Sequence, residues 1–326
     1  MSKIIIGVHG LGNKPEKQLL ERWWKLSIKE GLRRIGIYFL PFKFRLVYWA
    51  DLIYDKPLVE GGEAPYKLIE KYIPAKCLYK NHSHKIRQKL LDVLEWNMDK
   101  VFLKKDLSIH YEGVSNTIIR KYFRELEVYY SETLKDKNGK DVLAKELIRL
   151  KLFKVLKKVK RKNIFVIGHS MGSIITYDVL TLLLPNQKID TYATMGAPLG
   201  LPVIMAKNAV EQKAHGFSGE KLTTPPGVIH NWFNFSDLED VIAMNYNLAD
   251  DYNANRNGVS AIDYQITNDY QINGEINPHK SYGYLRTPEF AGSVYEFLLR
   301  DRTKLYVSII SFINKMISRF YKKEIS

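Results

Sequence analysis

Short apolar runs alternate with longer amphipathic stretches along most of this chain, and this alternation predicts strands separated by helices. An apolar run over residues 3–9 is followed by a helical pattern over residues 18–34 and by a second apolar run over residues 44–49. Strand, helix and strand at this spacing indicate a parallel sheet with crossover helices. The predicted fold class is therefore α/β, with a mostly parallel central sheet and helices on both faces.

The same alternation returns in the second half of the chain. We predict further strands and helices over residues 164–167, 173–180, 189–195, 228–235, 261–267 and 286–299. No internal repeat or low-complexity linker divides the sequence, so one domain over residues 1–303 is favoured over two.

The pattern loosens between about residue 57 and residue 140, where aromatic and charged residues mix with helical runs near 85–103 and 113–134. We predict a helical insertion in this part of the chain. Insertions at the carboxyl ends of parallel strands often shape or cover a substrate pocket. This insertion is expected either to act as such a lid or to serve packing or a partner surface.

Residues 304–326 are predicted to form an amphipathic basic C-terminal helix. Such a pattern is typical of a helix that lies on an anionic membrane, and docking against the domain would bury the same apolar surface equally well. One apolar stripe is predicted, made of Tyr306, Ile309, Ile310, Ile313, Met316, Ile317 and Phe320.

The charge of the chain narrows the classes of partner that it could bind. The 326 residues include 50 Lys and Arg against 35 Asp and Glu, a formal charge of +15, which favours anionic partners. The basic run over residues 149–162 fits a helix with a solvated lysine face, with a basic binding face as the alternative. Nothing resembles a zinc finger or an aromatic and basic RNA-binding signature, so nucleic acid is the weaker partner.

The single cysteine, Cys77, excludes an internal disulfide framework and fits a reducing compartment. The first nine residues leave no room for a signal peptide before the first strand, and no apolar run reaches the 18 or more residues of a membrane span. We therefore expect a cytoplasmic protein, with peripheral membrane association through the C-terminal helix left open.

The pentapeptide GHSMG at residues 168–172 carries the strongest chemical signal, because a predicted strand leads into it and a predicted helix follows it. A serine hydroxyl becomes a useful nucleophile when a strained strand-to-helix turn exposes it beside a base and amide donors. The glycines two residues on either side permit that turn. Ser170 is therefore the candidate nucleophile.

A serine nucleophile needs a histidine base and a carboxylate that orients it. Of the eight histidines, only His279 follows a plausible acid at a strand end, which gives the chain order Ser, Asp, His. Asp240 and Asp237 both follow the strand that ends at Phe235. Asp240 is favoured because an apolar step follows it, whereas Asp237 is the alternative acid or a brace for the turn.

The oxyanion of acyl transfer needs backbone amide donors. The amide of Met171 comes with the serine turn, and a second amide is expected from Leu11 in the sequence HGLG at residues 9–12. A glycine-rich turn without chemistry and a phosphate loop are the alternatives, but the spacing of a Walker loop is missing. The predicted chemistry requires no metal and no cofactor.

Together, the sequences HGLG at 9–12, GHSMG at 168–172, GAPL at 196–199 and the loops carrying Asp240 and His279 resemble the α/β-hydrolase superfamily, specifically lipase- and esterase-like serine hydrolases of a bacterial branch. The resemblance covers residues 1–50 and about 160–300. It departs from the family at Val241, where a proline commonly follows the acid.

The resemblance implies an α/β-hydrolase fold and hydrolysis of carboxylic esters, lipids included, through an acyl-enzyme. An acyltransferase with the same triad is the alternative, as is a non-catalytic module that binds a membrane or a partner. The sequence defines neither the acyl length and head group of the substrate nor the oligomeric state.

Overall fold

The computed structural model describes residues 2–75, 102–103, 109–110, 124, 126–217, 219, 221–243 and 246–323. The predicted helical run near 85–103 lies outside these ranges except for its last two residues. Those residues form a short strand, β3 (Phe102–Leu103), which pairs antiparallel with β4 (Ile109–His110).

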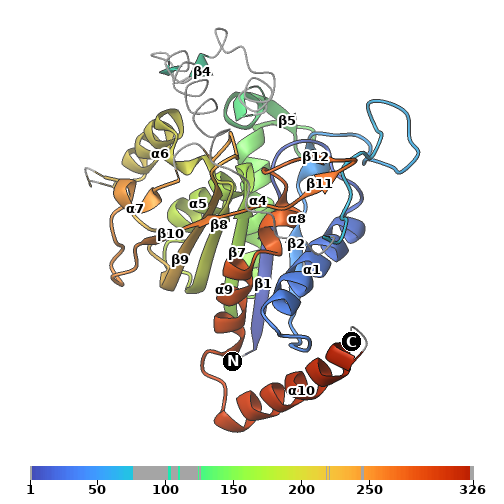
Figure 1. The fold of residues 1–326 in the computed structure, drawn as a ribbon. Coiled ribbons are helices and arrows are strands. Elements are labelled where there is room, and N and C mark those ends of the chain that lie inside the picture. The colour runs from blue at the N-terminus through green and yellow to red at the C-terminus, as the bar shows by residue number, and fades with distance from the viewer. Residues whose placement is uncertain are drawn as a thin grey trace.

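A six-stranded parallel sheet with the strand order β10-β9-β8-β7-β1-β2 forms the centre of the molecule (Figure 1). Register aligns the carboxyl ends of the middle strands, with Val8 beside Gly168 and Met195 beside Phe235. The predicted parallel sheet is confirmed. Its strands are β1 (Lys3–Val8), β2 (Phe44–Val47), β7 (Asn163–His169), β8 (Ile189–Met195), β9 (Val228–Asp237) and β10 (Ala261–Ile266).

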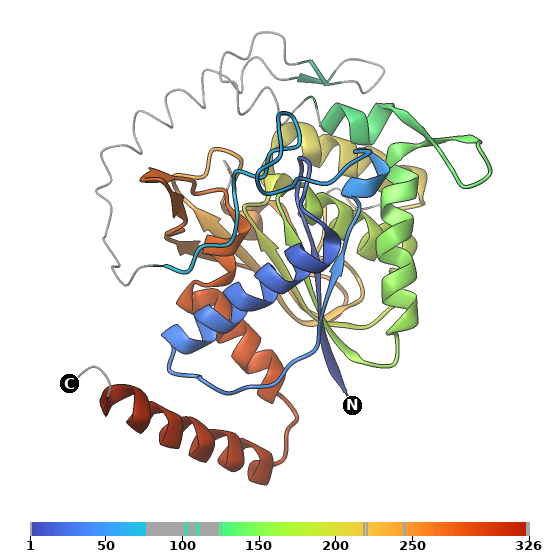
Figure 2. The same ribbon diagram turned by 90° about the vertical axis from the view of Figure 1, so that its right-hand side faces the viewer.

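Helices cover both faces of this sheet (Figures 1 and 2). Successive side chains of a strand point to opposite faces of a sheet, so apolar strands need cover on both faces. In β1, Ile5 packs into the core on one face, and Ile4 and Ile6 pack into the core on the other. The Ile5 face carries α1 (Lys17–Arg34), α8 (Ser281–Leu285) and α9 (Pro288–Leu299), and the opposite face carries α4 (Ala144–Lys158), α5 (Met171–Asp178) and α6 (Pro202–Ala214).

Shorter elements connect these layers. They are η1 (Ala50–Leu52), the π-helical turn η2 (Val179–Leu183), η3 (Pro198–Gly200), α7 (Leu248–Asp251) and the hairpin of β11 (Gln271–Ile272) and β12 (Glu275–Ile276).

The predicted helical run near 113–134 is wrong at its C-terminal end. Among its described residues, 126–131 are helical, but Thr133–Lys135 forms β5 and pairs with β6 (Asp141–Leu143). Asn138 and Gly139 form the turn between them, with a φ of 77° at Gly139, and the Asp136 carboxylate accepts the Asn138 amide over 2.8 Å. This local turn chemistry outweighs the helical pattern.

The C-terminal helix α10 (Lys304–Lys323) docks on the loop that precedes β2. The Asn314 side chain accepts the amides of Tyr38 and Phe39 over 2.7 and 2.8 Å and donates to the Phe39 carbonyl over 2.9 Å. Ile310 is buried beside it, whereas other apolar residues of the helix face solvent. The domain therefore covers the predicted apolar stripe only in part, since Ile309 and Met316 stay exposed. Within the described residues, no helix is both long and apolar enough to span a bilayer.

Candidate active site

Ser170 lies on the sharp turn between β7 and α5, at the carboxyl edge of the sheet. Its backbone has φ 53° and ψ −126°, in a region that side-chain-bearing residues rarely occupy, and its amide donates to the Met195 carbonyl over 2.9 Å. Such a turn lifts the serine side chain out of the strand toward the space above the sheet.

The two glycines of the GHSMG sequence permit this turn by removing side-chain atoms from crowded positions. A Cβ at Gly172 would lie 2.2 Å from the Val8 carbonyl oxygen, and a Cβ at Gly168 would lie 2.6 Å from the Ser173 Cα. Both contacts are with backbone atoms, which cannot move aside cheaply. The spacing of the motif therefore follows from close packing of the turn against β1 and α5.

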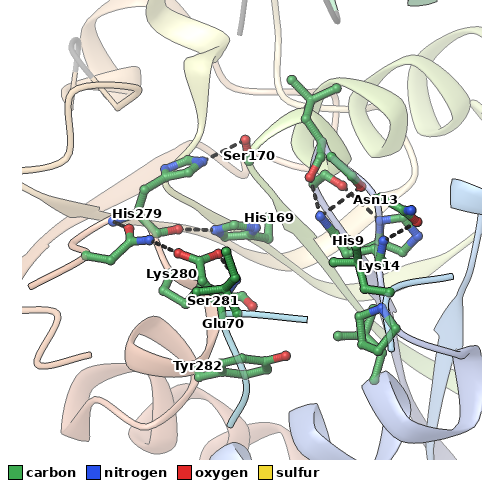
Figure 3. Close-up of a pocket in the computed structure, with 18 of the residues that line it drawn as sticks. His9, Asn13, Lys14, Glu70, His169, Ser170, His279, Lys280, Ser281 and Tyr282 are labelled. Atoms are coloured by element: carbon green, nitrogen blue, oxygen red, sulfur yellow. Dashed lines mark hydrogen bonds and ion pairs between the residues drawn. The ribbon is translucent and has the colours of Figure 1, made fainter. Parts of the chain in front are cut away.

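His279 lies between Ser170 and Asp240 (Figure 3 draws the contact with Ser170). Its Nε2 atom is 2.9 Å from the Ser170 Oγ, and its Nδ1 atom is 2.8 and 2.9 Å from the two Asp240 carboxylate oxygens. Because a carboxylate only accepts hydrogen bonds, Nδ1 carries the proton and Nε2 accepts from the serine hydroxyl. The structure thus brings together the predicted nucleophile, base and favoured acid.

The Asp240 carboxylate is fully buried and has further donors. The Ile242 amide donates to Oδ1 over 3.0 Å, and the Tyr284 hydroxyl donates to Oδ2 over 2.7 Å. Burial raises the pKa of the Tyr284 hydroxyl well above its usual range, and the nearby Asp240 charge adds to this shift. Tyr284 therefore stays protonated and acts as a donor, a role that sequence reasoning missed.

Asp237 joins two loops through backbone amides. Its carboxylate accepts the amide of Glu239 over 2.8 Å and the amide of Asn268 over 2.5 Å. Burial raises the pKa of Asp237 to about 6, although these two backbone donors oppose the shift. The geometry matches the second role considered for this residue, a brace for the turn.

The loop that carries His279 is fixed by neighbouring side chains. The His279 amide donates to the Asn277 Oδ1 over 3.1 Å, and the Asn268 amide group donates to the Pro278 carbonyl over 2.8 Å. His169 donates from Nε2 to the His279 carbonyl over 2.8 Å (Figure 3). His169 belongs to the serine turn and is 110 positions from His279 in the chain, so this contact could not be found from the sequence.

The turn after β1 lies beside Ser170, and His9 and Lys14 brace it. His9 donates from Nδ1 to the Gly10 carbonyl over 2.9 Å and accepts the Trp49 amide at Nε2 over 3.1 Å. Burial lowers the pKa of His9 well below its usual range, so its ring is neutral, as the acceptor role at Nε2 requires. The Lys14 ammonium donates to the carbonyl oxygens of Leu11 and Gly12.

A cavity of about 690 Å³ opens above Ser170 and His279. Leu11 lines it, while Met171, the other predicted oxyanion residue, is the first residue of α5 and is buried. The apolar lining includes Leu20, Trp24, Leu58, Ile69, Ile242 and Tyr282, and the charged lining consists of Lys14, Lys67, Glu70 and Lys280.

The first part of the predicted insertion contributes to this cavity through residues 58–70. Glu70 accepts hydrogen bonds from the Asn277 side-chain amide and from the Lys280 ammonium, which ties this segment to the loop carrying His279 (Figure 3). Burial alone would raise the pKa of Glu70, but Lys280 and Asn277 outweigh burial and lower it. The segment therefore lines the cavity and is tied to the loop that carries His279.

Within the described residues, no group of three or more His, Cys, Asp or Glu side chains is arranged to hold a metal ion. The titratable groups around the cavity instead form pairs and chains of hydrogen bonds, as the contacts of His279 and Glu70 illustrate.

A mostly parallel sheet flanked by helices, with Ser170 on the turn after a central strand, is an α/β-hydrolase fold. The family model for lecithin:cholesterol acyltransferase matches residues 120–212. The matched segment includes Ser170, whereas Asp240 and His279 lie beyond it. No curated protein matches the chain. Fold and family match together support an α/β-hydrolase-like protein and an enzyme of the ester-acting kind.

Proposed function

We propose that this protein is a serine hydrolase of carboxylic esters, lipids included, and that its catalytic unit lies within residues 1–303. The observation that carries the proposal is the continuous chain from the Ser170 hydroxyl through His279 to the buried Asp240 carboxylate, with contacts of 2.9 and 2.8 Å. A strained serine beside an imidazole nitrogen that can accept its proton is the arrangement that activates a weak nucleophile.

The proposed reaction proceeds through an acyl-enzyme. Ser170 Oγ attacks the acyl carbonyl while His279 Nε2 takes the hydroxyl proton, and the backbone amides of Leu11 and Met171 donate to the developing oxyanion. His279 then gives its proton to the leaving alkoxide, which departs as the alcohol. A water molecule, deprotonated by the same Nε2, attacks the acyl-enzyme, and collapse of that intermediate releases the acid and restores the Ser170 hydroxyl.

Asp240 is the proposed acid because it keeps the imidazole in the tautomer that this sequence of steps needs. Its carboxylate holds the proton on Nδ1, which leaves Nε2 free to accept from the serine. It also stabilises the imidazolium that forms when Nε2 takes the serine proton. Tyr284 and the Ile242 amide fix the carboxylate in turn.

Labelling with a fluorophosphonate tests the mechanism, because this probe reacts with an activated serine. Wild-type protein should be labelled, whereas Ser170→Ala and His279→Ala should not. Ser281→Ala is the matched control, since Ser281 lines the same cavity without contacting the imidazole nitrogens. Labelling that persists in Ser170→Ala would refute the mechanism, as would a biological activity that Ser170→Ala leaves intact, which a non-catalytic binding module predicts.

Transfer of the acyl group to an alcohol is a second candidate function, favoured by the match to an acyltransferase family model. The same acyl-enzyme would serve both reactions, and the acceptor would depend on the exclusion of water from the site. Product analysis with an ester and a competing alcohol distinguishes them. Free acid as the dominant product at every alcohol concentration supports the hydrolase, and a dominant new ester supports the transferase.

A further inference from the structure

The docked helix α10 exposes a second apolar face. Asn314 and Ile310 hold it to the domain, while the side away from the domain carries a row that we name the outer stripe. Its members are Leu305, Ile309, Phe312 and Met316, which are 71%, 48%, 64% and 44% exposed. Spacings of four, three and four residues align them along one side of a helix.

Positive charge flanks the outer stripe. Lys304, Lys315 and Arg319 are exposed, and their spacing of eleven and four residues places them along the same edge of the stripe. No acidic residue occurs between residues 304 and 323. Four large apolar side chains would suit many partners, but a cationic edge on a helix without acidic residues selects a negatively charged one.

A second copy of the chain fits this face poorly. The four side chains of the outer stripe offer roughly a few hundred Å² of apolar surface, below the roughly 800 Å² per partner of a stable interface. Two such helices packed stripe to stripe would also bring like charges together. A lipid surface has neither limitation, because it accepts single apolar side chains and its phosphates neutralise the cations.

We propose that the outer stripe docks this protein on an anionic lipid bilayer. The helix lies in the plane of the membrane, with Leu305 and Phe312 inserted among the acyl chains and Lys304, Lys315 and Arg319 at the level of the phosphates. This surface is independent of the chemistry proposed for Ser170.

The location of α10 determines how the bound protein faces the membrane. The helix lies on residues 38–39, at the end of the sheet where β1 and β2 begin (Figures 1 and 2). Ser170 directly follows the carboxyl end of β7, which is at the opposite end of the parallel sheet. A protein bound through the outer stripe therefore keeps its cavity on the side away from that bilayer. The helix acts as a tether rather than as a cover for the active site.

Vesicle co-sedimentation with the full chain tests this proposal. Phosphatidylcholine vesicles with about one third phosphatidylserine should bind wild-type protein at least ~10 times better than pure phosphatidylcholine. Leu305→Ser/Phe312→Ser and Lys304→Glu/Lys315→Glu should each lose about tenfold or more of this binding. Lys157→Glu/Lys158→Glu is the matched control, since it changes the net charge equally on exposed positions of α4 and should keep wild-type binding.

Three outcomes would overturn the proposal. Wild-type protein could fail to bind the anionic vesicles, or the α4 control could lose binding as strongly as the α10 charge variant, which would indicate attraction by net charge alone. Alternatively, analytical ultracentrifugation could show a wild-type dimer that Leu305→Ser/Phe312→Ser converts to a monomer while vesicles bind neither protein. That result would assign the outer stripe to a second copy of the chain.

Discussion

His169 donates a hydrogen bond from its Nε2 atom to the main-chain carbonyl of His279 over 2.8 Å. Because His169 directly precedes Ser170 in the chain, this contact ties the loop of the base to the turn of the nucleophile. Burial lowers the pKa of His169 well below its usual range, and the neighbouring His279 adds to the effect. The ring is therefore neutral and carries its proton on Nε2, as the carbonyl acceptor requires.

Replacing His169 should separate this positioning role from simple packing. His169→Met removes the donor at similar volume and should lower kcat for an ester substrate about tenfold or more, with little change in KM, because a displaced base misaligns the transition state. His169→Gln places an amide donor near the Nε2 position and should recover most of kcat. Equal kcat values for the two variants would contradict a role for this hydrogen bond.

Asp240→Asn should lower kcat far more than Asp237→Asn. Asp240→Asn allows the other imidazole tautomer, so kcat should fall by about 10³- to 10⁴-fold. Asp237→Asn removes a charge that contacts only backbone amides and should lower kcat less than ~10-fold. Steady-state turnover of a chromogenic ester measures both, and the reverse ranking would assign the role of the acid to Asp237.

Asp237 should also give the stability of the protein a distinct pH dependence. Its pKa is raised to about 6 by burial, so between about pH 4 and pH 6 the folded protein holds a proton that the unfolded chain has already released. This group's contribution to the unfolding free energy is therefore present at low pH and is lost as pH rises through about 6, by at most about 3 kcal/mol.

Asp237→Asn removes the titrating carboxyl group, and with it the loss of unfolding free energy as pH rises. The unfolding free energy of the variant minus that of wild type should increase from about pH 4 to about pH 6 and then level off, on top of a constant offset from the altered hydrogen bonds. Urea denaturation across this pH range measures the difference, with the exposed Asp55→Asn as the control for removing a carboxylate. A difference that does not vary with pH would contradict the raised pKa.

The sheet was predictable because its strands are short apolar runs and its helices are amphipathic, and both patterns are local in sequence. The strand predicted at 189–195 coincides with β8, and the helix predicted at 18–34 differs from α1 by one residue. The segment over residues 133–135 was misjudged because the Asn138–Gly139 turn converts the end of a helical pattern into a hairpin.

The sequence predicts the candidate site only through the order of its residues along the chain and their positions after predicted strands. These constraints select Ser170 and His279 and leave two aspartates, because both follow the same strand. Contacts made across the fold could not be predicted. The hydrogen bond from Tyr284 to Asp240 joins residues 44 positions apart, and that from His169 to His279 joins residues 110 positions apart. No local sequence pattern therefore indicates either hydrogen bond.

Two glycines beside the candidate site should tolerate no side chain. A Cβ at Gly10 would lie 2.7 Å from the Ser170 Cβ, and a Cβ at Gly196, where φ is +52°, would lie 2.7 Å from the Asp240 Oδ2. Gly10→Ala forces the proposed oxyanion turn away from the serine, and Gly196→Ala displaces the acid. We expect kcat to fall by about 10²-fold or more in each.

Gly292→Ala in α9 is the matched control for both glycine substitutions, because nothing lies within 4 Å of a Cβ at this position. Its kcat should equal that of wild type, and the helix propensity of alanine should raise thermal stability slightly. Circular dichroism establishes that all three variants are folded before turnover is compared. Wild-type kcat in a folded Gly10→Ala variant would show that the turn after β1 can move without affecting Ser170, and it would remove the amide of Leu11 from the proposed mechanism.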